Sequence, residues 1–368
     1  MRAHRLPQLL LLISLIASAS AAGPAWQRSF FFDKAQANFN IADFTCPSPK
    51  FCIAAGTVEQ NEGRSYPYSV ITHDGGVHWT FQKPSDYPVS LFFLNDANGW
   101  MVTNRGIWAT GDGGETWKRI RSGRGYVRVF FTDPRHGWVA GARRLFEETS
   151  DGGLHWAGVP DAGSVPGTPA DITFEYISFG DPLHGAVLGE VAGHSTPILP
   201  DWMDPQTARY KLPADGSVFA GRTLDGGRTW TWTNVASRQT LSMAAFPAAD
   251  RCWMVFGPGS PTQPDSQVVQ RYWEGSKNTD VYRLAGARIS DLDTASDGSL
   301  MVAAVQLGGK LANAPVPGKV RILSGGDFST LRDEDVDYRA VAGRIMLANT
   351  SSEWFAATDT GIILRRKP

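Results

Sequence analysis

Charge, metal-binding spacings and long hydrophobic runs are all scarce in this sequence. Charged residues make up 19% of its 368 residues and the formal net charge is -1, which argues against nonspecific binding to nucleic acid. The seven histidines and three cysteines show no HExxH or paired-cysteine spacing, so we predict neither a metal nor another cofactor. No segment offers about 20 uninterrupted apolar residues, so no transmembrane helix is predicted.

The first residues are typical of a cleaved bacterial secretory signal. Two arginines precede the apolar run 9–16, and small residues fill positions 17–22. We therefore predict a signal peptide at 1–22 and a single mature domain at 23–368, exported to the periplasm or secreted.

Two of the three cysteines are close together in the segment CPSPKFC. In an oxidising compartment we expect Cys46 and Cys52 to form a disulfide, with two buried thiols as the alternative. Cys252 has no evident partner and lies in the apolar run CWMVF, where we expect a buried thiol.

Glycine, proline and tryptophan are plentiful, with 39, 23 and 13 residues, which favours many short strands joined by tight turns. The chain also repeats one phrase four times: THDGGVHW, TGDGGETW, TSDGGLHW and TLDGGRTW. The aspartates of the phrase are Asp74, Asp112, Asp151 and Asp225, so one unit spans about 38 residues and the last gap is a single unit with a large insertion.

A second landmark extends the repeat beyond the last phrase. An apolar residue is followed seven positions later by a new apolar run, as at Phe93 and Trp100 or Phe131 and Trp138, and we place Phe44 and Phe51 in the first unit. Seven units of four short strands predict an all-β fold, a seven-bladed β-propeller. The last unit has only three candidate strands, so we expect the N-terminal strand WQRSFFFD to join the C-terminal blade and close the ring.

The repeated phrase fits a hairpin between the third and fourth strands of a blade. The glycine pair accepts positive φ, and the aspartate and threonine side chains can bond backbone N–H groups of their own turn. The tryptophan then packs against its blade. We interpret these residues as structural and not catalytic, because equivalent turns of separate blades should not converge on one substrate. The predicted structural residues are Thr72, Asp74, Trp79, Thr110, Asp112, Trp117, Thr149, Asp151, Trp156, Thr223, Asp225 and Trp230.

The phrase T-x-D-G-G-x-[TH]-W resembles the Asp-box, or bacterial neuraminidase repeat. Its combination with a Gly-Trp turn, as in NGWMVTNRGIWATGDGGETW, resembles the Ycf48-like photosystem II assembly factors. The resemblance is sharp over about 88–158 and faint beyond 240. It implies an exported, non-enzymatic seven-bladed propeller that holds a partner polypeptide and assists the assembly of a membrane complex.

Two segments are candidate binding sites. A large insertion in blade four, about 188–218, carries Trp202 and Tyr210; it reads either as a lid over the channel or as a loop packed onto its own blade. The segment KRIRSGRGYVRVFF is the densest positive run, and it could hold carboxylates or phosphates of an acidic protein segment, an anionic glycan or a lipid headgroup. Its candidate partner-binding residues are Lys118, Arg119, Arg121, Arg124 and Arg128.

We therefore predict a monomeric binding scaffold with a protein partner, and no enzyme. The alternatives are a sialidase-like Asp-box glycosidase and a carbohydrate-binding lectin. Sialidase chemistry needs three arginines, a tyrosine activated by glutamate and an acid aspartate from different blades. The Arg-Ile-Pro signature of sialidases is absent from the mature chain, and RYWEG at 271–275 places arginine, tyrosine and glutamate too close in sequence.

Overall fold

The computed structural model describes residues 25–366 except 62, 160–161, 163–171, 192–215, 238–240, 249–250, 258–266, 273–278, 307–309, 312–313, 316–317 and 338–339. The predicted signal peptide, 1–22, therefore lies outside the described residues. Within the described part of the chain, no helix has the length and hydropathy of a transmembrane span.

The described strands form seven antiparallel sheets of four or five strands, numbered here in chain order. The first sheet contains β2 (Ala37–Thr45), β3 (Cys52–Gln60), β4 (Ser65–Thr72) and β5 (Thr80–Gln82). The second contains β6 (Pro88–Phe93), β7 (Gly99–Thr103), β8 (Gly106–Thr110) and β9 (Lys118–Ser122). The third contains β10 (Tyr126–Phe131), β11 (Gly137–Gly141), β12 (Phe146–Thr149) and β13 (Ala157–Gly158). The fourth contains β14 (Ile172–Phe179), β15 (Gly185–Val191), β16 (Gly216–Thr223) and β17 (Thr231–Ser237).

The remaining sheets include the strands expected least clearly from sequence. The fifth contains β18 (Leu241–Ala248), β19 (Arg251–Phe256), β20 (Gln267–Tyr272) and β21 (Thr279–Leu284). The sixth contains β22 (Ala287–Thr294), β23 (Leu300–Gln306), β26 (Gly318–Gly325), β27 (Arg332–Asp333) and β28 (Val341–Ala342). The seventh contains β29 (Ile345–Asn349), β30 (Trp354–Thr358), β31 (Ile362–Arg366) and β1 (Trp26–Phe31). A separate two-stranded sheet joins β24 (Lys310–Leu311) and β25 (Ala314–Pro315).

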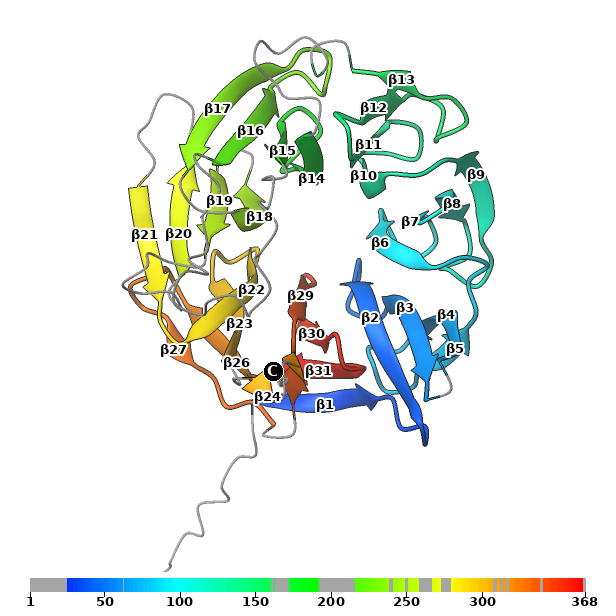
Figure 1. Cartoon of the computed structure of the whole chain (residues 1–368), viewed down its shortest axis with the longest axis vertical. Helices are drawn as coiled ribbons and strands as arrows, with labels where there is room; N and C mark the ends of the chain where they lie inside the picture. The colour runs from blue at the N-terminus through cyan, green and yellow to red at the C-terminus, as the bar shows by residue number, and fades with distance from the viewer. Residues whose placement is uncertain are drawn as a thin grey trace, which may run out of the picture.

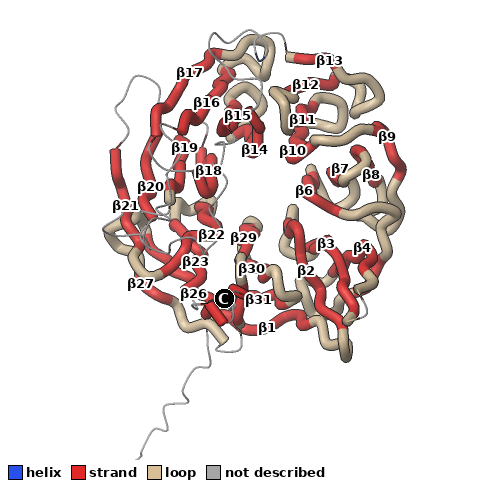
Figure 2. The backbone as a smooth tube through the Cα atoms, viewed as in Figure 1, coloured by secondary structure: helices blue, strands red, loops and turns tan. Residues whose placement is uncertain are grey.

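The seven sheets follow one another in chain order around a common centre (Figure 1). The first strand of each sheet lies innermost, and loops connect the strands at both ends (Figure 2). The second strands β7 and β11 are buried along their whole length, whereas the outer strands β5 and β9 are largely exposed. Hydrophobic clusters span neighbouring sheets, so the core lies between sheets.

The chain ends meet in the seventh sheet. β1 pairs antiparallel with β31, from Trp26 opposite Arg366 to Phe31 opposite Ile362. Trp26 also forms a parallel bridge to Val336, in the segment between β27 and β28 of the sixth sheet. The expected pairing of the N-terminal strand with the C-terminal strand is therefore present.

A recurring contact closes the first hairpin of several sheets. Phe93, Phe131 and Phe179 each lie over the glycine opposite them, and a Cβ on Gly99 would come within 2.6 Å of the Phe93 ring. In the first sheet, the Cys46–Cys52 disulfide occupies this position, one residue beyond the pair Thr45–Ile53. The disulfide is therefore confirmed, but the landmark that we placed at Phe44 and Phe51 is wrong by two residues, because the cysteines replace the phenylalanine and glycine.

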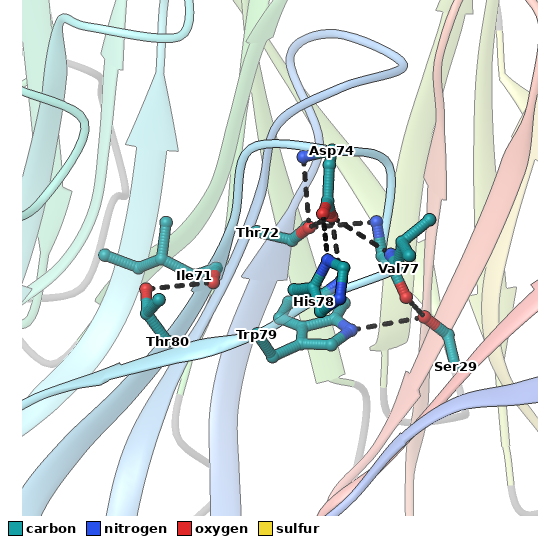
Figure 3. Close-up of polar contacts among 9 residues, drawn as sticks. Ser29, Ile71, Thr72, Asp74, Val77, His78, Trp79 and Thr80 are labelled. Carbon is teal, nitrogen blue, oxygen red and sulfur yellow. Dashed lines mark hydrogen bonds and ion pairs between the residues drawn. The ribbon is translucent and has the colours of Figure 1, made fainter.

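The repeated phrase forms a turn between the third and fourth strands of the first four sheets; we call residues 72–79, 110–117, 149–156 and 223–230 the Asp turns. In the first, the buried Thr72 Oγ1 donates to Asp74 Oδ1 at 2.9 Å and accepts from the Gly76 N–H (Figure 3). Asp74 Oδ1 also accepts from the His78 N–H, while Oδ2 lies 2.6 Å from His78 Nδ1. The other three turns repeat this network, with Thr116 and Thr229 hydroxyls in place of the imidazole in two of them.

The two glycines of each Asp turn have separate roles. The first has a positive φ of 71 to 77° and donates to a carbonyl of its own sheet, as Gly113 does to Ala97. A Cβ on Gly113 would lie 2.8 Å from the Asp96 carbonyl oxygen. The second glycine packs against the preceding sheet: a Cβ on Gly227 would lie 2.4 Å from the Trp138 ring. The phrase therefore closes its own sheet and also fits it against its neighbour.

Candidate functional site

The inner strands surround a cavity of about 430 Å³ at the centre of the molecule, which we call the channel site. Every inner strand contributes to its lining, from Asp43 on β2 to Leu347 on β29. Phe92 and Phe130 form an aromatic side, with ring centroids 4.6 Å apart. Arg128, Tyr176, Asp291 and Asp293 add charged and polar groups. Polar groups make up the larger part of the exposed lining, and the aromatic pair supplies an apolar side.

Irregularities in the backbone of the inner strands orient these polar side chains. The pairing register of six inner strands shifts by one residue, near the middle of β2, β14 and β22 and at the start of β6, β10 and β18. A bulge of this kind re-aims the side chain that follows it. The residues directly after the shift are Asp43, Ser90, Arg128, Tyr176, Met243 and Asp291, and all but Ser90 line the channel site.

Asp43 is the centre of one network in the channel. Its Oδ1 accepts from the Phe44 N–H, and its Oδ2 accepts from the Leu91 N–H of the second sheet at 2.8 Å. The same Oδ2 accepts from Arg128 Nη1 of the third sheet at 3.1 Å. One carboxylate thus connects three sheets and fixes the guanidinium in the channel.

Asp291 forms the equivalent connection between the sixth and seventh sheets. Its carboxylate oxygens accept from the Leu292 and Leu347 N–H groups, both at 2.8 Å. Burial raises the pKa of Asp291 to about 7 and that of Asp293 to about 6. Glu190, which accepts from the Leu241 N–H of the fifth sheet, has its pKa raised by burial to about 7. Burial of these three carboxyl groups disfavours their charged form.

The three acids with raised pKa values and the aspartates of the Asp turns together predict that the protein is most stable in mildly acidic solution. Because Asp291, Asp293 and Glu190 bind protons more tightly when folded, stability falls as the pH rises from about 4 to about 7. The Asp turns act in the opposite direction, since the His155 backbone N–H and the Thr229 hydroxyl lower the pKa values of Asp151 and Asp225 to about 2. Their contribution is lost as the pH falls from about 4 towards 2.

We therefore expect the highest melting temperature near pH 4 to 5, measured by thermal unfolding at constant ionic strength. In the variant Asp291→Asn, the decline between pH 5 and 8 should be shallower, because one of the three acids no longer titrates. A melting temperature that rises steadily from pH 5 to 8 would contradict this account of the channel acids.

The predicted basic run does not form one patch. Arg128 points into the channel, whereas Arg121 forms an ion pair with Glu147 at 2.5 Å and packs on the Tyr126 and Trp156 rings. Arg119 lies over the Trp108 ring at the outer strand. The remaining two residues, Lys118 and Arg124, are exposed. Successive strand residues point to opposite sides, and β9 and β10 belong to different sheets, so adjacency in sequence does not become a shared surface.

The insertion in the fourth sheet is shorter than predicted. Residues 188–191 and 216–218 belong to β15 and β16. The candidate residues Trp202 and Tyr210 lie outside the described residues, so their role as a lid stays a prediction.

We had expected the Asp turns to lie apart from one another, but two of them lie close together. Asp151 of the third sheet and Asp225 of the fourth line a single groove of about 560 Å³. Neighbouring sheets bring the same end of each unit together, so equivalent turns become adjacent. The expectation that these aspartates cannot share a site is therefore wrong for this pair.

Sequence reasoning missed the acids of the channel. Asp43 and Asp291 lie in similar four-residue segments of inner strands, IADF and ISDL, each with one aspartate and with apolar residues at both ends. That repeated pattern was the available signal, because a carboxylate in an inner strand needs partners from a neighbouring strand.

Sheets of four strands around a central cavity define this protein as a β-propeller. No family model and no curated protein matches the chain. Solved structures do resemble it. "YCF48 bound to D1 peptide" has 15% identity and a TM-score of 0.60, and the match covers 92% of this chain and 99% of that chain. "YCF48 from Cyanidioschyzon merolae" has 14% identity and a TM-score of 0.58, covering 93% and 98% of the two chains.

A more distant propeller is also similar. The WD40 β-propeller domain of Doa1 has 6% identity and a TM-score of 0.54, with 93% of this chain and 96% of that chain covered. At these identities the likeness establishes the fold, and the predicted Ycf48-like propeller is supported at that level.

Proposed function

We propose that this protein is an exported, non-enzymatic binding propeller of seven blades, closed by β1, whose channel site holds a segment of a partner polypeptide. Through that contact it assists the assembly or stability of an envelope or membrane complex. The observation that carries the proposal is the channel site, in which Asp43 fixes the Arg128 guanidinium beside the aromatic pair Phe92 and Phe130. A preordered cation beside an apolar surface suits a peptide that presents an acidic group and a hydrophobic side chain.

Four further observations support it. The pairing of β1 with β31 supports a closed ring, and the seven sheets of the described residues support seven blades. The Cys46–Cys52 disulfide fits an oxidising compartment and hence export. A propeller of similar fold carries a peptide in a solved structure, "YCF48 bound to D1 peptide".

The channel chemistry favours binding over a sialidase-like reaction. A tyrosine nucleophile needs activation, but burial raises the pKa of Tyr176, and its hydroxyl donates to the Ser242 carbonyl at 3.1 Å. Among the residues described as lining the cavity, two are arginines, and one of these, Arg128, is already paired with Asp43. This arrangement does not supply the three arginines that a sialidase uses.

The experiment uses the mature protein and two variants, each with one arginine of the basic run replaced, to capture partners from the native envelope fraction. We expect crosslinking and pull-down with mature protein to capture one polypeptide, and Arg128→Gln to reduce that capture about tenfold through loss of one charge-assisted contact. The matched variant Arg124→Gln changes an exposed arginine on the connection between β9 and β10 and should capture as wild type does.

Melting temperatures of both variants show that each is folded. Equal capture by wild type and Arg128→Gln would remove the channel site from the proposal. Absence of any captured polypeptide would reject the scaffold function itself.

A further inference from the structure

The groove between the third and fourth sheets lies apart from the channel, at the end of the sheets where the Asp turns lie. Its volume of about 560 Å³ exceeds that of the channel site. The third sheet contributes the turn from Thr132 to His136, Glu148 and the Asp turn at 149–156. The fourth contributes Pro182, Leu183 and the residues from Asp225 to Arg228.

The charges lining the groove are mainly negative. Four carboxylates, those of Asp133, Glu148, Asp151 and Asp225, stand against the single guanidinium of Arg228 and two imidazoles. Three of the carboxylates stay ionised near neutral pH, because hydrogen bonds within their turns lower the pKa values of Asp133, Asp151 and Asp225. The groove therefore complements a cationic ligand.

The rim of the groove is apolar. Seven large hydrophobic side chains are exposed in the described part of the chain, and three of them belong to the turns that contribute to the groove: Leu154, Leu183 and Leu224. Leu183 lines the groove and is 53% exposed, while Leu154 and Leu224 directly precede the lining residues His155 and Asp225. The matching position of the second Asp turn is Glu115, so an exposed leucine is not a requirement of the turn. Exposed apolar side chains gathered at a groove mark an interaction surface.

The floor of the groove contains an unused hydrogen-bond donor. Trp138 lines the groove and is 4% exposed, and its Nε1 has no acceptor within the described residues. The indole is held in place from both sides, by the Phe179 ring at 4.3 Å and by Gly227 of the Asp turn. The groove therefore has a rigid aromatic floor.

We propose that this groove docks a basic, amphipathic polypeptide segment. Its apolar side chains pack on the three leucines, and its lysine or arginine side chains lie over the four carboxylates. The contact is independent of the channel site, so the propeller has one partner surface at its centre and a second at the junction of two sheets.

The test uses a defined probe, a fluorescein-labelled peptide of sequence Lys-Leu-Lys-Lys-Leu-Lys, with Glu-Leu-Glu-Glu-Leu-Glu as its charge control. We expect saturable binding of the basic peptide alone, followed by fluorescence anisotropy. The double variant Glu148→Gln with Leu183→Ser should weaken it about tenfold, since it removes one groove carboxylate and one rim contact. Neither side chain is fully buried, so the variant should keep the wild-type melting temperature.

The matched control is Val77→Ser with Glu115→Gln, which changes the residues equivalent to Leu154 in the first and second Asp turns. It also removes one exposed hydrophobic side chain and one negative charge, and it should bind the probe as wild type does. Equal weakening by both double variants would mean that the probe reads overall charge, and the groove assignment would be wrong. No saturable binding, or equal binding of the acidic peptide, would overturn the proposal outright.

Discussion

Replacement of Trp26 by alanine is expected to lower the free energy of unfolding by about 3 to 5 kcal/mol. Trp26 is completely buried, and its backbone N–H and C=O bond to Asp335 and Asp337. Its indole Nε1 donates to Glu334, which also accepts from the Arg366 guanidinium. One side chain therefore joins the first strand of the domain to the sixth and seventh sheets, and its loss leaves a cavity and removes one of the donors to the Glu334 carboxylate.

Equilibrium unfolding in urea measures this effect. The matched variant is Phe31→Ala at the other end of β1, where the side chain is 45% exposed and should contribute about 1 kcal/mol or less. Similar destabilisation by the two variants, or a change below about 1 kcal/mol for Trp26→Ala, would show that β1 does not hold the seventh sheet together.

Replacement of Asp43 by alanine should cost about 3 kcal/mol, the second largest effect expected here. The substitution leaves the Leu91 N–H without its acceptor and the Arg128 guanidinium without its partner. The conservative variant Asp43→Asn keeps an acceptor for the N–H but loses the charge, so it should be destabilised by less. If alanine and asparagine have the same small effect in urea unfolding, Asp43 does not connect the first three sheets.

The local features of this fold could be predicted from sequence because their residues are contiguous. An Asp turn contains its own donors and acceptors within eight residues, so the phrase alone indicates a hairpin clasp. The strands of the last sheet were also predictable, since three apolar runs remained for a four-stranded unit. Cys46 and Cys52 were close enough in sequence to suggest their bond.

The sites depended on features that sequence separation conceals. Asp43 meets Leu91 and Arg128 only because a bulge turns its side chain towards the next two sheets. Arg121 and Arg128 lie in the same basic run, yet Arg121 forms an ion pair with Glu147 of the third sheet and Arg128 faces the channel. Asp151 and Asp225, separated by the insertion of the fourth sheet, line the same groove. Each of these contacts joins different sheets. The spacing of the repeat predicts the order of the sheets, but it does not predict which side chains of neighbouring sheets come into contact.

The central claim is that a partner polypeptide enters the channel, and site-specific photocrosslinking tests it most directly. Benzoylphenylalanine would replace Phe130, which lines the channel site, or Phe81, which is exposed on the outer strand of the first sheet. Illumination in the native envelope fraction should give one crosslinked polypeptide from position 130 and none from position 81. A product from position 81 alone, or none from position 130, would contradict the account.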